Sequence, residues 1–330
     1  MGGFTVKHVL TGCLLWVAAL AVAAQQPPAP VPACNRACLE AFVDKYLDAM
    51  QAHKATDDLF AREVKFTENG VRLPLGHEGL WFDMSARGNY KFYVPDIETQ
   101  QVAYIGTVRY GAAPAAGNAP ANPGTLAALA VRLKVVDGKI TEVEQLAIRP
   151  DNTQQVTNRN AAAAPPRFAP TGEAVDKMSK PHPVYFETIA QNQRATRDEL
   201  IHTANYYFAG LQRNDGKGYY PFTDDCVRFE NGITTTTQCK KQFQESLKGI
   251  VSRIRDRRFV AVDRERGIVF AFAFFDHDRI NWTWQLAELF KIENGQIRRI
   301  EAVFQRAPYG IPSGWSTYEQ GMSEEPQTIR

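Results

Sequence analysis

The sequence of 330 residues lacks the short motifs that carry most nucleotide and hydrolase chemistry. It contains no phosphate loop, no dinucleotide-binding fingerprint, no G-x-S-x-G nucleophile turn, and no histidine and cysteine spacing typical of a metal site. These absences disfavour phosphoryl transfer, hydride transfer, serine-type hydrolysis and metal catalysis. We therefore expect neither a cofactor nor a metal.

The sequence also has little excess charge of either sign. Lys and Arg number 38 against 36 Asp and Glu, and only 37 remain once the amino-terminal segment with Lys7 is removed. Nucleic acids select strongly basic surfaces, so no nucleic-acid partner is expected. The hydrophobic fraction of 44% indicates a globular protein, and roughly 300 remaining residues suit two domains better than one.

Only one apolar run is long, and it stands at the amino terminus. Lys7 precedes an apolar stretch from Val9 to Ala23, and the polar Gln25 follows small residues. We interpret residues 1–24 as a secretory signal, since the run is too short to span a membrane comfortably. A periplasmic or secreted location follows, with no membrane contact after the signal is removed.

Cysteine is scarce, and four remain when Cys13 leaves with the signal. An even count in an exported chain predicts disulfides. Cys226 and Cys239 lie in the same half of the sequence and would close a loop of about 14 residues. Elimination then pairs Cys34 with Cys38. Zinc is disfavoured because no histidine pair accompanies them.

An internal repeat organises the rest of the sequence. Four blocks recur in the same order, at an offset of about 160 residues. They are a helical apolar stripe (Leu39–Met50 and Leu200–Leu211), a Glu-Asn-Gly turn (68–70 and 230–232), a strand end (Tyr93–Glu98 and Val260–Glu265) and a closing hairpin (Leu133–Ile140 and Phe290–Ile297).

Each unit therefore has helices first and then a meander of strands. This order predicts an α+β fold with a curved antiparallel sheet. We place the first domain at residues 33–150 and the second at 197–310. A linker rich in Ala, Pro, Asn and Gln spans 151–196, and a carboxy-terminal tail spans 311–330.

Both units resemble the NTF2-like superfamily in its SnoaL-like branch, over residues 36–149 and 197–306. The resemblance lies in the order of elements, the Glu-Asn-Gly turn and the closing F-K-I-E-N-G-Q-I-R-R-I segment of the second unit. It implies two tandem cones, each with helices packed on a curved antiparallel sheet around an apolar pocket. The superfamily includes ketosteroid isomerase, limonene epoxide hydrolase and non-catalytic binders, but no catalytic motif of these enzymes matches this sequence. Tandem copies behind a signal are also similar to exported bacterial and fungal proteins of unassigned function.

Two glutamates recur at the same place in both units. Glu68 and Glu230 each precede an Asn-Gly pair, and a turn does not require Glu there. Alternation with Phe66 places Glu68 on the apolar face of its strand, whereas Val227 and Phe229 alternate out of phase with Glu230. Both are candidate catalytic carboxylates, and the alternative is a turn-stabilising or solvated role.

Glu288 is the third candidate carboxylate. It alternates with Leu286 and Phe290 and stands where the first unit has Val131. A carboxyl on an inward apolar face has a raised pKa and can serve as a general acid or base near neutral pH. The alternative is an edge strand with a partly wet inner face. We expect the functional pocket in the second unit, with Trp284 in its wall.

His277 lies between two aspartates and is a candidate proton shuttle, although its place between two strands also suits an ordinary turn. His202 replaces Ala41 of the first unit and is a candidate ligand contact, with a surface helix position as the alternative. Trp282 and Tyr104 are candidate aromatic walls or core residues. We interpret the basic run at 253–258 as a solvated helix end, and the alternative is a role in steering an anionic substrate.

Two classes of function fit these features. The first is a cofactor-independent lyase, isomerase or hydrolase that acts on a small apolar or aromatic molecule in an enclosed pocket. The second is a non-catalytic small-molecule-binding or scaffold protein of the exported compartment. The sequence leaves the ligand and any self-association open.

Overall fold

The computed structural model describes residues 1–3, 33–117, 119–150 and 171–329. Most of the predicted signal at 1–24 and the first part of the predicted linker, 151–170, lie outside these residues. The chain divides into Met1–Val31 and one compact unit from Pro32 to Arg330.

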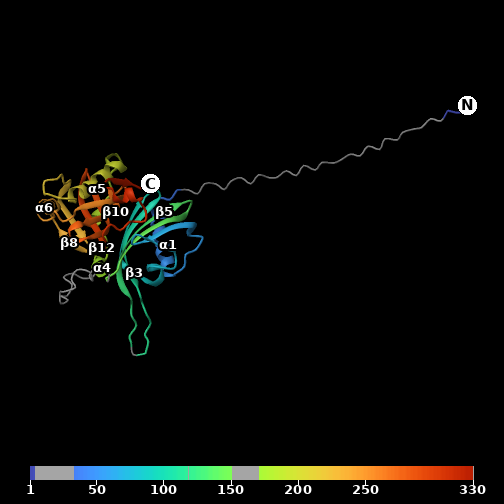
Figure 1. Ribbon diagram of the computed structural model, residues 1–330, viewed down its shortest axis with the longest axis horizontal. Coiled ribbons are helices and arrows are strands. Elements are labelled where there is room, and N and C mark those ends of the chain that lie inside the picture. Colours follow the sequence, from blue (N-terminus) through green and yellow to red (C-terminus); the bar gives the residue numbers. More distant parts are fainter. Residues whose placement is uncertain (4–32, 118, 151–170, 330) are drawn as a thin grey trace. The chain divides into compact units, whose positions relative to one another are not determined.

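The first repeat starts with a helix whose N-cap, Asn35, accepts a hydrogen bond from Cys38 N. Its sheet has the strand order β2-β1-β6-β5-β4-β3. The elements are α1 (Arg36–Gln51), β1 (Phe60–Glu68), β2 (Val71–Arg72), α2 (Leu80–Asp83), β3 (Met84–Asp96), β4 (Gln101–Tyr110), β5 (Thr125–Val136) and β6 (Lys139–Ile148). The β4–β5 hairpin projects well beyond the sheet (Figure 1).

The second repeat starts with a helix that has a complete capping box between Thr196 and Glu199. Its sheet has the strand order β13-β9-β10-β11-β12-β7-β8. The elements are α5 (Arg197–Leu211), β7 (Phe222–Glu230), β8 (Ile233–Thr236), α6 (Cys239–Glu245), β9 (Arg253–Asp263), β10 (Ile268–His277), η3 (Asp278–Ile280), β11 (Trp282–Glu293), β12 (Gln296–Pro308), α7 (Tyr318–Met322) and β13 (Pro326–Thr328).

This order of elements confirms the α+β prediction and the tandem NTF2-like arrangement. The prediction of purely antiparallel sheets was wrong, because both sheets are mixed. β1 runs parallel to β6, and β7 runs parallel to β12. In each repeat a helix and the whole meander separate these two strands, and such a long connection allows parallel pairing.

The repeat equivalence extends to the turns. Gly70 and Gly232 both follow the first strand of their repeat, with φ of 82° and 78°. Gly138 and Gly295 both close the final hairpin, with φ of 72°. A left-handed backbone favours glycine at these positions, so turn geometry explains these shared residues.

Three apolar clusters make up the core. Within each repeat, helices cover the concave face of the sheet, with α1 packed on β3 and β4 and α5 packed on β9 and β10. The third cluster joins the outer faces of the two sheets, with Phe92 and Leu146 from the first and Phe270 and Leu289 from the second. Strands such as β10 are therefore buried on both faces.

The segment that we interpreted as a linker is partly folded. It contains α4 (Thr171–Lys177), η1 (Pro183–Phe186) and η2 (Gln191–Gln193). Val175 and Tyr185 enter the cluster between the two sheets. In the segment that we interpreted as a tail, β13 pairs with β9, and the Trp315 indole donates to Thr67 Oγ1 of the first repeat at 2.8 Å.

The basic run was wrongly interpreted as a solvated helix end, because all four arginines lie on β9 and three are buried. Arg255 shares Asp276 with Arg253, and Arg258 pairs with Glu144 of the first repeat. Remote carboxylates in the sequence thus compensate the buried charges.

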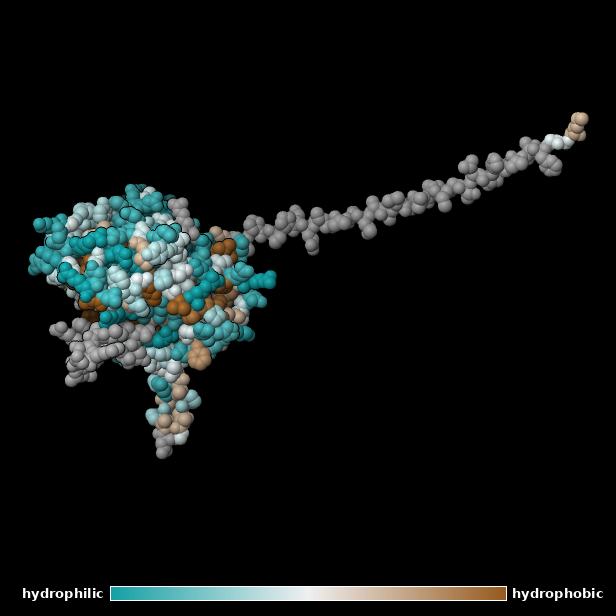
Figure 2. Space-filling model, in the orientation of Figure 1, coloured by the Kyte–Doolittle hydropathy of each residue, from teal (hydrophilic) through white to brown (hydrophobic). Residues whose placement is uncertain are grey.

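Both predicted disulfides are formed, Cys34–Cys38 and Cys226–Cys239. They fit an oxidising extracellular or periplasmic compartment. No helix in the described part of the chain is long and apolar enough to cross a membrane. On the face seen in Figure 2, hydrophilic residues dominate and hydrophobic ones form small groups.

Candidate functional site

Glu288 lies on the concave face of the second sheet. Its strand β11 alternates, so that Leu286, Glu288 and Phe290 face α5 while Ala287 and Leu289 face the first repeat. The cross-strand neighbours of Glu288 are Ala302 and Ala271. A carboxyl group therefore stands between two small residues on an otherwise apolar surface.

Burial dominates the electrostatics of Glu288. The residue is 1% exposed, and this burial raises the pKa of its carboxyl to about 8, although the Arg228 charge and the Tyr207 hydroxyl oppose the rise. The Tyr207 hydroxyl faces the Glu288 carboxyl and lowers its pKa, but neither Glu288 Oε2 nor this hydroxyl forms a hydrogen bond of good geometry in the described part of the chain. Near neutral pH the site thus holds a protonated acid and a phenol with unused hydrogen-bonding capacity.

Arg228 and Glu230 form an ion pair beside this acid. Both lie on β7, where Arg228 donates to Glu230 Oε1 and, at 2.5 Å, to Gln242 Oε1. The Arg228 side chain is 5% exposed and that of Glu230 is 21% exposed. Glu230 therefore connects the buried cluster to solvent, and it shares the inward face with Arg228 rather than with Val227 and Phe229.

The equivalent glutamate of the first repeat is fully occupied. Glu68 accepts hydrogen bonds from Leu80 N at 2.8 Å, from Gln145 Nε2 at 2.6 Å and from Arg149 at 2.8 Å. A Cβ on Gly79 would lie 2.3 Å from Glu68 Oε2, so α2 begins tightly against the carboxylate. These contacts give Glu68 an anchoring role.

The two repeats supply the polar group from different strands. In the first, Gln145 on β6 faces Val131 and accepts a 2.6 Å hydrogen bond from the Tyr46 hydroxyl. In the second, the acid stands on β11 and faces Ala302. Tyr207 occupies the place of Tyr46 in the repeat, and its hydroxyl faces the Glu288 carboxyl rather than a glutamine.

Arg228 and Tyr207 are site residues that the sequence analysis missed. Arg228 replaces Phe66 of the first repeat, two residues before the shared glutamate in each case. This substitution of a charge for a phenyl ring at matched inward positions is the signal that identifies Arg228. Tyr207 lies within the apolar stripe Leu200–Leu211, and its buried hydroxyl beside the Glu288 carboxyl distinguishes it from the other members.

His277 and the two tryptophans gather farther along the same sheet. The His277 ring stacks on Trp282 with centroids 4.8 Å apart and meets Trp284 edge-on at 4.5 Å. Trp284 also packs on Phe304, and Arg306 lies over Trp282. Because Trp284 is four residues from Glu288 on one strand, about 13 Å separates the two positions.

His277 is a buried strand residue, so its interpretation as part of a turn was wrong. Its Nδ1 lies 3.0 Å from Phe275 O, its Nε2 has no partner in the described residues, and burial lowers its pKa. The neighbouring Asp276 faces the opposite side of the sheet, where it binds Arg253, Arg255 and Thr283.

Two other candidates lie away from the Glu288 cluster. Tyr104 packs in the apolar core of the first repeat, where Gly106 leaves room for its ring. His202 lies on the exposed side of α5, with Nε2 3.0 Å from the Tyr206 hydroxyl. His202 therefore takes the surface helix position that we gave as its alternative.

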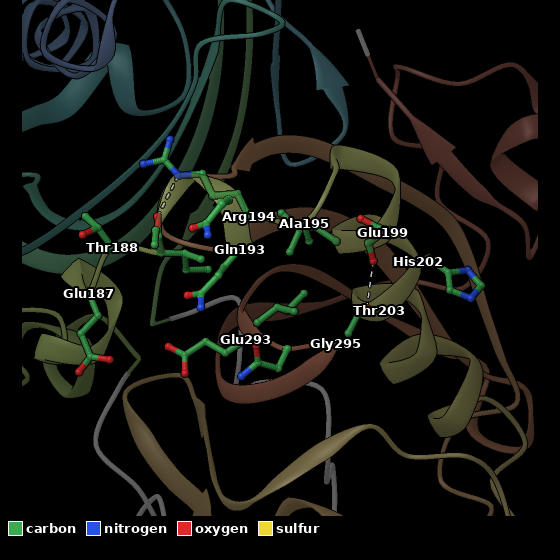
Figure 3. A pocket seen from close by; sticks show the side chains of 16 residues that line it. Glu187, Thr188, Gln193, Arg194, Ala195, Glu199, His202, Thr203, Glu293 and Gly295 are labelled. Carbon is green, nitrogen blue, oxygen red and sulfur yellow. Dashed lines mark hydrogen bonds between the residues drawn. The ribbon is translucent and has the colours of Figure 1, made fainter.

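His202 instead lines a groove of about 680 Å³ (Figure 3). One wall is the segment 187–195, another is the first turns of α5, and the third is the β11–β12 hairpin. Ile189 and Ala195 supply apolar surface, while Gln193, Glu293 and His202 supply polar groups. The combination of apolar surface with a few polar groups is typical of ligand sites.

No group of three or more His, Cys, Asp or Glu side chains in the described residues could hold a metal ion. The side chains of the Glu288 cluster can form hydrogen bonds and transfer protons. The groove offers binding contacts at its surface.

The family model for the "Domain of unknown function (DUF8021)" matches residues 33–147 and 193–304. The chain belongs to this family and carries its domain twice. No curated protein sequence matches the chain significantly.

Among solved structures, a designed protein with a curved β-sheet is similar at 18% identity and a TM-score of 0.26, over 33% of this chain and 87% of the other. A LEH-like epoxide hydrolase of M. tuberculosis is similar at 15% identity and a TM-score of 0.29, over 33% of this chain and 84% of the other. An NTF2-like protein of unknown function from Burkholderia xenovorans LB400 is similar at 12% identity and a TM-score of 0.28, over 36% of this chain and 94% of the other.

Proposed function

We propose that this exported protein acts on a small, largely apolar or aromatic molecule by cofactor-independent acid–base chemistry in its second repeat. The reaction class is that of a lyase, isomerase or hydrolase, and the units belong to the SnoaL-like branch. Residues 1–24 direct export, and the two disulfides are consistent with that destination.

The observation that carries this proposal is the buried pair of the Glu288 carboxyl and the Tyr207 hydroxyl, which face each other without a hydrogen bond of good geometry at Glu288 Oε2 or at the hydroxyl in the described part of the chain. Burying a carboxyl without a partner costs free energy, and such groups concentrate at functional sites. The first repeat has no equivalent, since its Gln145 and Tyr46 satisfy each other.

Each group has a role that its environment supports. Glu288 is protonated at neutral pH and serves as the general acid, and Tyr207 donates a second hydrogen bond to the same substrate oxygen. Glu230 is nearer to solvent and acts as the base, while Arg228 positions it through their ion pair. Trp284 and Trp282 form the aromatic wall toward the end of the sheet.

The route to Glu288 passes Leu286, which lies between the acid and Trp284 on the concave face. Leu286 is 2% exposed, so a ligand that reaches the acid displaces its contacts. We expect Leu286→Ala to accelerate ligand binding without moving the acid, because the side chain is shortened and the strand is unchanged.

A Glu288→Gln substitution tests the function directly, since it keeps the shape and removes the proton. Acetophenone binding is followed by tryptophan fluorescence, and turnover is measured with styrene oxide, phenyl acetate and any molecule that native mass spectrometry finds bound to the purified protein. Loss of turnover with binding retained supports the enzyme. If the folded variant binds and turns over every compound as the wild type does, the assignment is wrong.

The second candidate is a non-catalytic binding protein, and the groove in Figure 3 favours it. Its volume of about 680 Å³ lies in the range of small-molecule sites. Here Gln193→Trp, which fills the groove, should abolish ligand binding, while Glu288→Gln leaves it intact. If Gln193→Trp leaves ligand binding intact and Glu288→Gln abolishes it, the groove is not the binding site.

A further inference from the structure

A second cleft, of about 510 Å³, lies at one end of the second sheet. It forms where the segment before β9, the turn η3 and the end of β12 meet. Its charged lining residues are Arg213, Arg253, Arg279 and Asp278, and the others are Gly249, Val251, Ser252 and Tyr309. Guanidinium groups thus outnumber carboxylates three to one in the lining.

Two of the guanidinium groups are held in place by carboxylates outside the lining. Arg253 donates through Nε and Nη2 to Asp276 Oδ2, at 2.9 and 2.6 Å, which leaves its Nη1 uncommitted. Arg213 binds Glu324 at 2.6 Å. These contacts fix the positions of both positive charges before any ligand arrives.

Arg279 is different, because its guanidinium makes no hydrogen bond or ion pair within the residues that the structure describes. Asp278, the carboxylate of the lining, accepts from Arg279 N at 2.7 Å and from the Ser252 hydroxyl. Asp278 interacts with Arg279 electrostatically but forms no direct ion pair with it. The cleft therefore contains one guanidinium, that of Arg279, whose hydrogen-bond donors have no partner among the described residues.

We infer that this cleft binds a small anion that carries a carboxylate or phosphate group. The Arg279 guanidinium and Arg253 Nη1 supply charge-assisted hydrogen bonds to its oxygens. The Tyr309 ring, which is 39% exposed, provides a flat surface for an attached apolar body. This site is separate from Glu288, because Arg253 and Asp276 face the opposite side of the sheet.

The probes are inorganic phosphate, benzoate and the neutral isostere benzamide, titrated into the full chain by calorimetry at low ionic strength. We expect saturable binding of phosphate, benzoate or both, and no comparable binding of benzamide. Arg279→Gln should weaken binding about tenfold, and Arg279→Lys should restore much of it because the charge returns. Arg62→Gln, at an exposed arginine on β1, is the matched control and should change nothing.

The probes that bind also indicate the chemical class of the natural anion. Phosphate alone indicates a phosphate ester, and benzoate alone indicates a carboxylic acid. The inference is overturned if neither anion binds saturably, if benzamide binds as tightly as benzoate, or if Arg62→Gln weakens binding as much as Arg279→Gln does.

Discussion

Glu68 and Glu288 show how neighbours decide what a buried carboxyl does. Glu68 has three donors around it, and every one is a group that would otherwise lack an acceptor. Glu288 has an arginine and a phenol nearby but no bond at Oε2. The first arrangement stabilises the fold, whereas the second stores an unsatisfied group that a ligand can satisfy.

The raised pKa of Glu288 predicts how stability varies with pH. Its folded pKa is about 8 and the ordinary value is 4.5, so the carboxyl is protonated in both states at low pH. As pH rises from 4.5 to about 8, the unfolded state loses its proton first and stability falls, by on the order of several kcal/mol at most.

Urea denaturation at pH 5 and pH 9 checks this, with wild type and Glu288→Gln compared at each pH. The difference between the two proteins isolates Glu288 from Arg228, Glu230 and Tyr207, which face it. We expect the variant to lose less stability than the wild type between these pH values. Equal losses would contradict a raised pKa.

A substitution at Glu68 should act on stability instead. Glu68→Ala leaves Leu80 N, Gln145 and Arg149 without their acceptor, and we expect a loss of about 2–4 kcal/mol in the free energy of unfolding. Glu63→Ala, at an exposed position on the same strand, is the control and should cost little. A Glu68 variant as stable as the control would remove the anchoring role.

At the scale of elements, the prediction was best where successive side chains of a strand alternate between its two faces. The inward position of Glu288 follows from β11, because one residue in two faces α5. On β9, Arg255 and Arg258 are buried on a strand, and their partners Asp276 and Glu144 are distant in sequence. No local pattern reveals such partners, so the run resembles a solvated surface.

The disulfide Cys226–Cys239 joins β7 to the start of α6, on either side of the β7–β8 hairpin. It closes a longer loop than Cys34–Cys38 does, so its removal frees more conformations in the unfolded chain. Replacing both Cys226 and Cys239 by Ala should cost about 3 kcal/mol, and the same change at Cys34 and Cys38 should cost less. Thermal unfolding of both variants measures the two losses of stability. A larger loss for the Cys34 and Cys38 variant would contradict the prediction.

At the scale of the whole molecule, the repeat was visible in the sequence but its packing was not. Strand β10 is apolar on both faces, from Ile268 to Phe275, and such a strand indicates cover on both sides. The first repeat provides that cover on one side, through Phe92, Leu146 and other residues that are equally apolar. An apolar surface can pack against many other apolar surfaces, so the sequence does not show which one covers it. A buried charge requires an opposite charge at a defined place.

Two ion pairs between the repeats differ in how deeply their side chains are buried. Arg258 meets Glu144 at 2.7 Å with side chains 3% and 8% exposed, and Arg264 meets Glu98 at 2.8 Å with side chains 38% and 41% exposed. Arg258→Met removes a cation from Asp256 and leaves Glu144 with only the longer contact to Arg132, at 3.6 Å, and should cost about 3–5 kcal/mol. Arg264→Met should cost less than about 1 kcal/mol. Urea denaturation by fluorescence and circular dichroism measures both, and the two signals should coincide because the shared core makes the repeats unfold together. Equal costs would show that burial does not set the strength of the pair, and separate transitions would show that the repeats are independent.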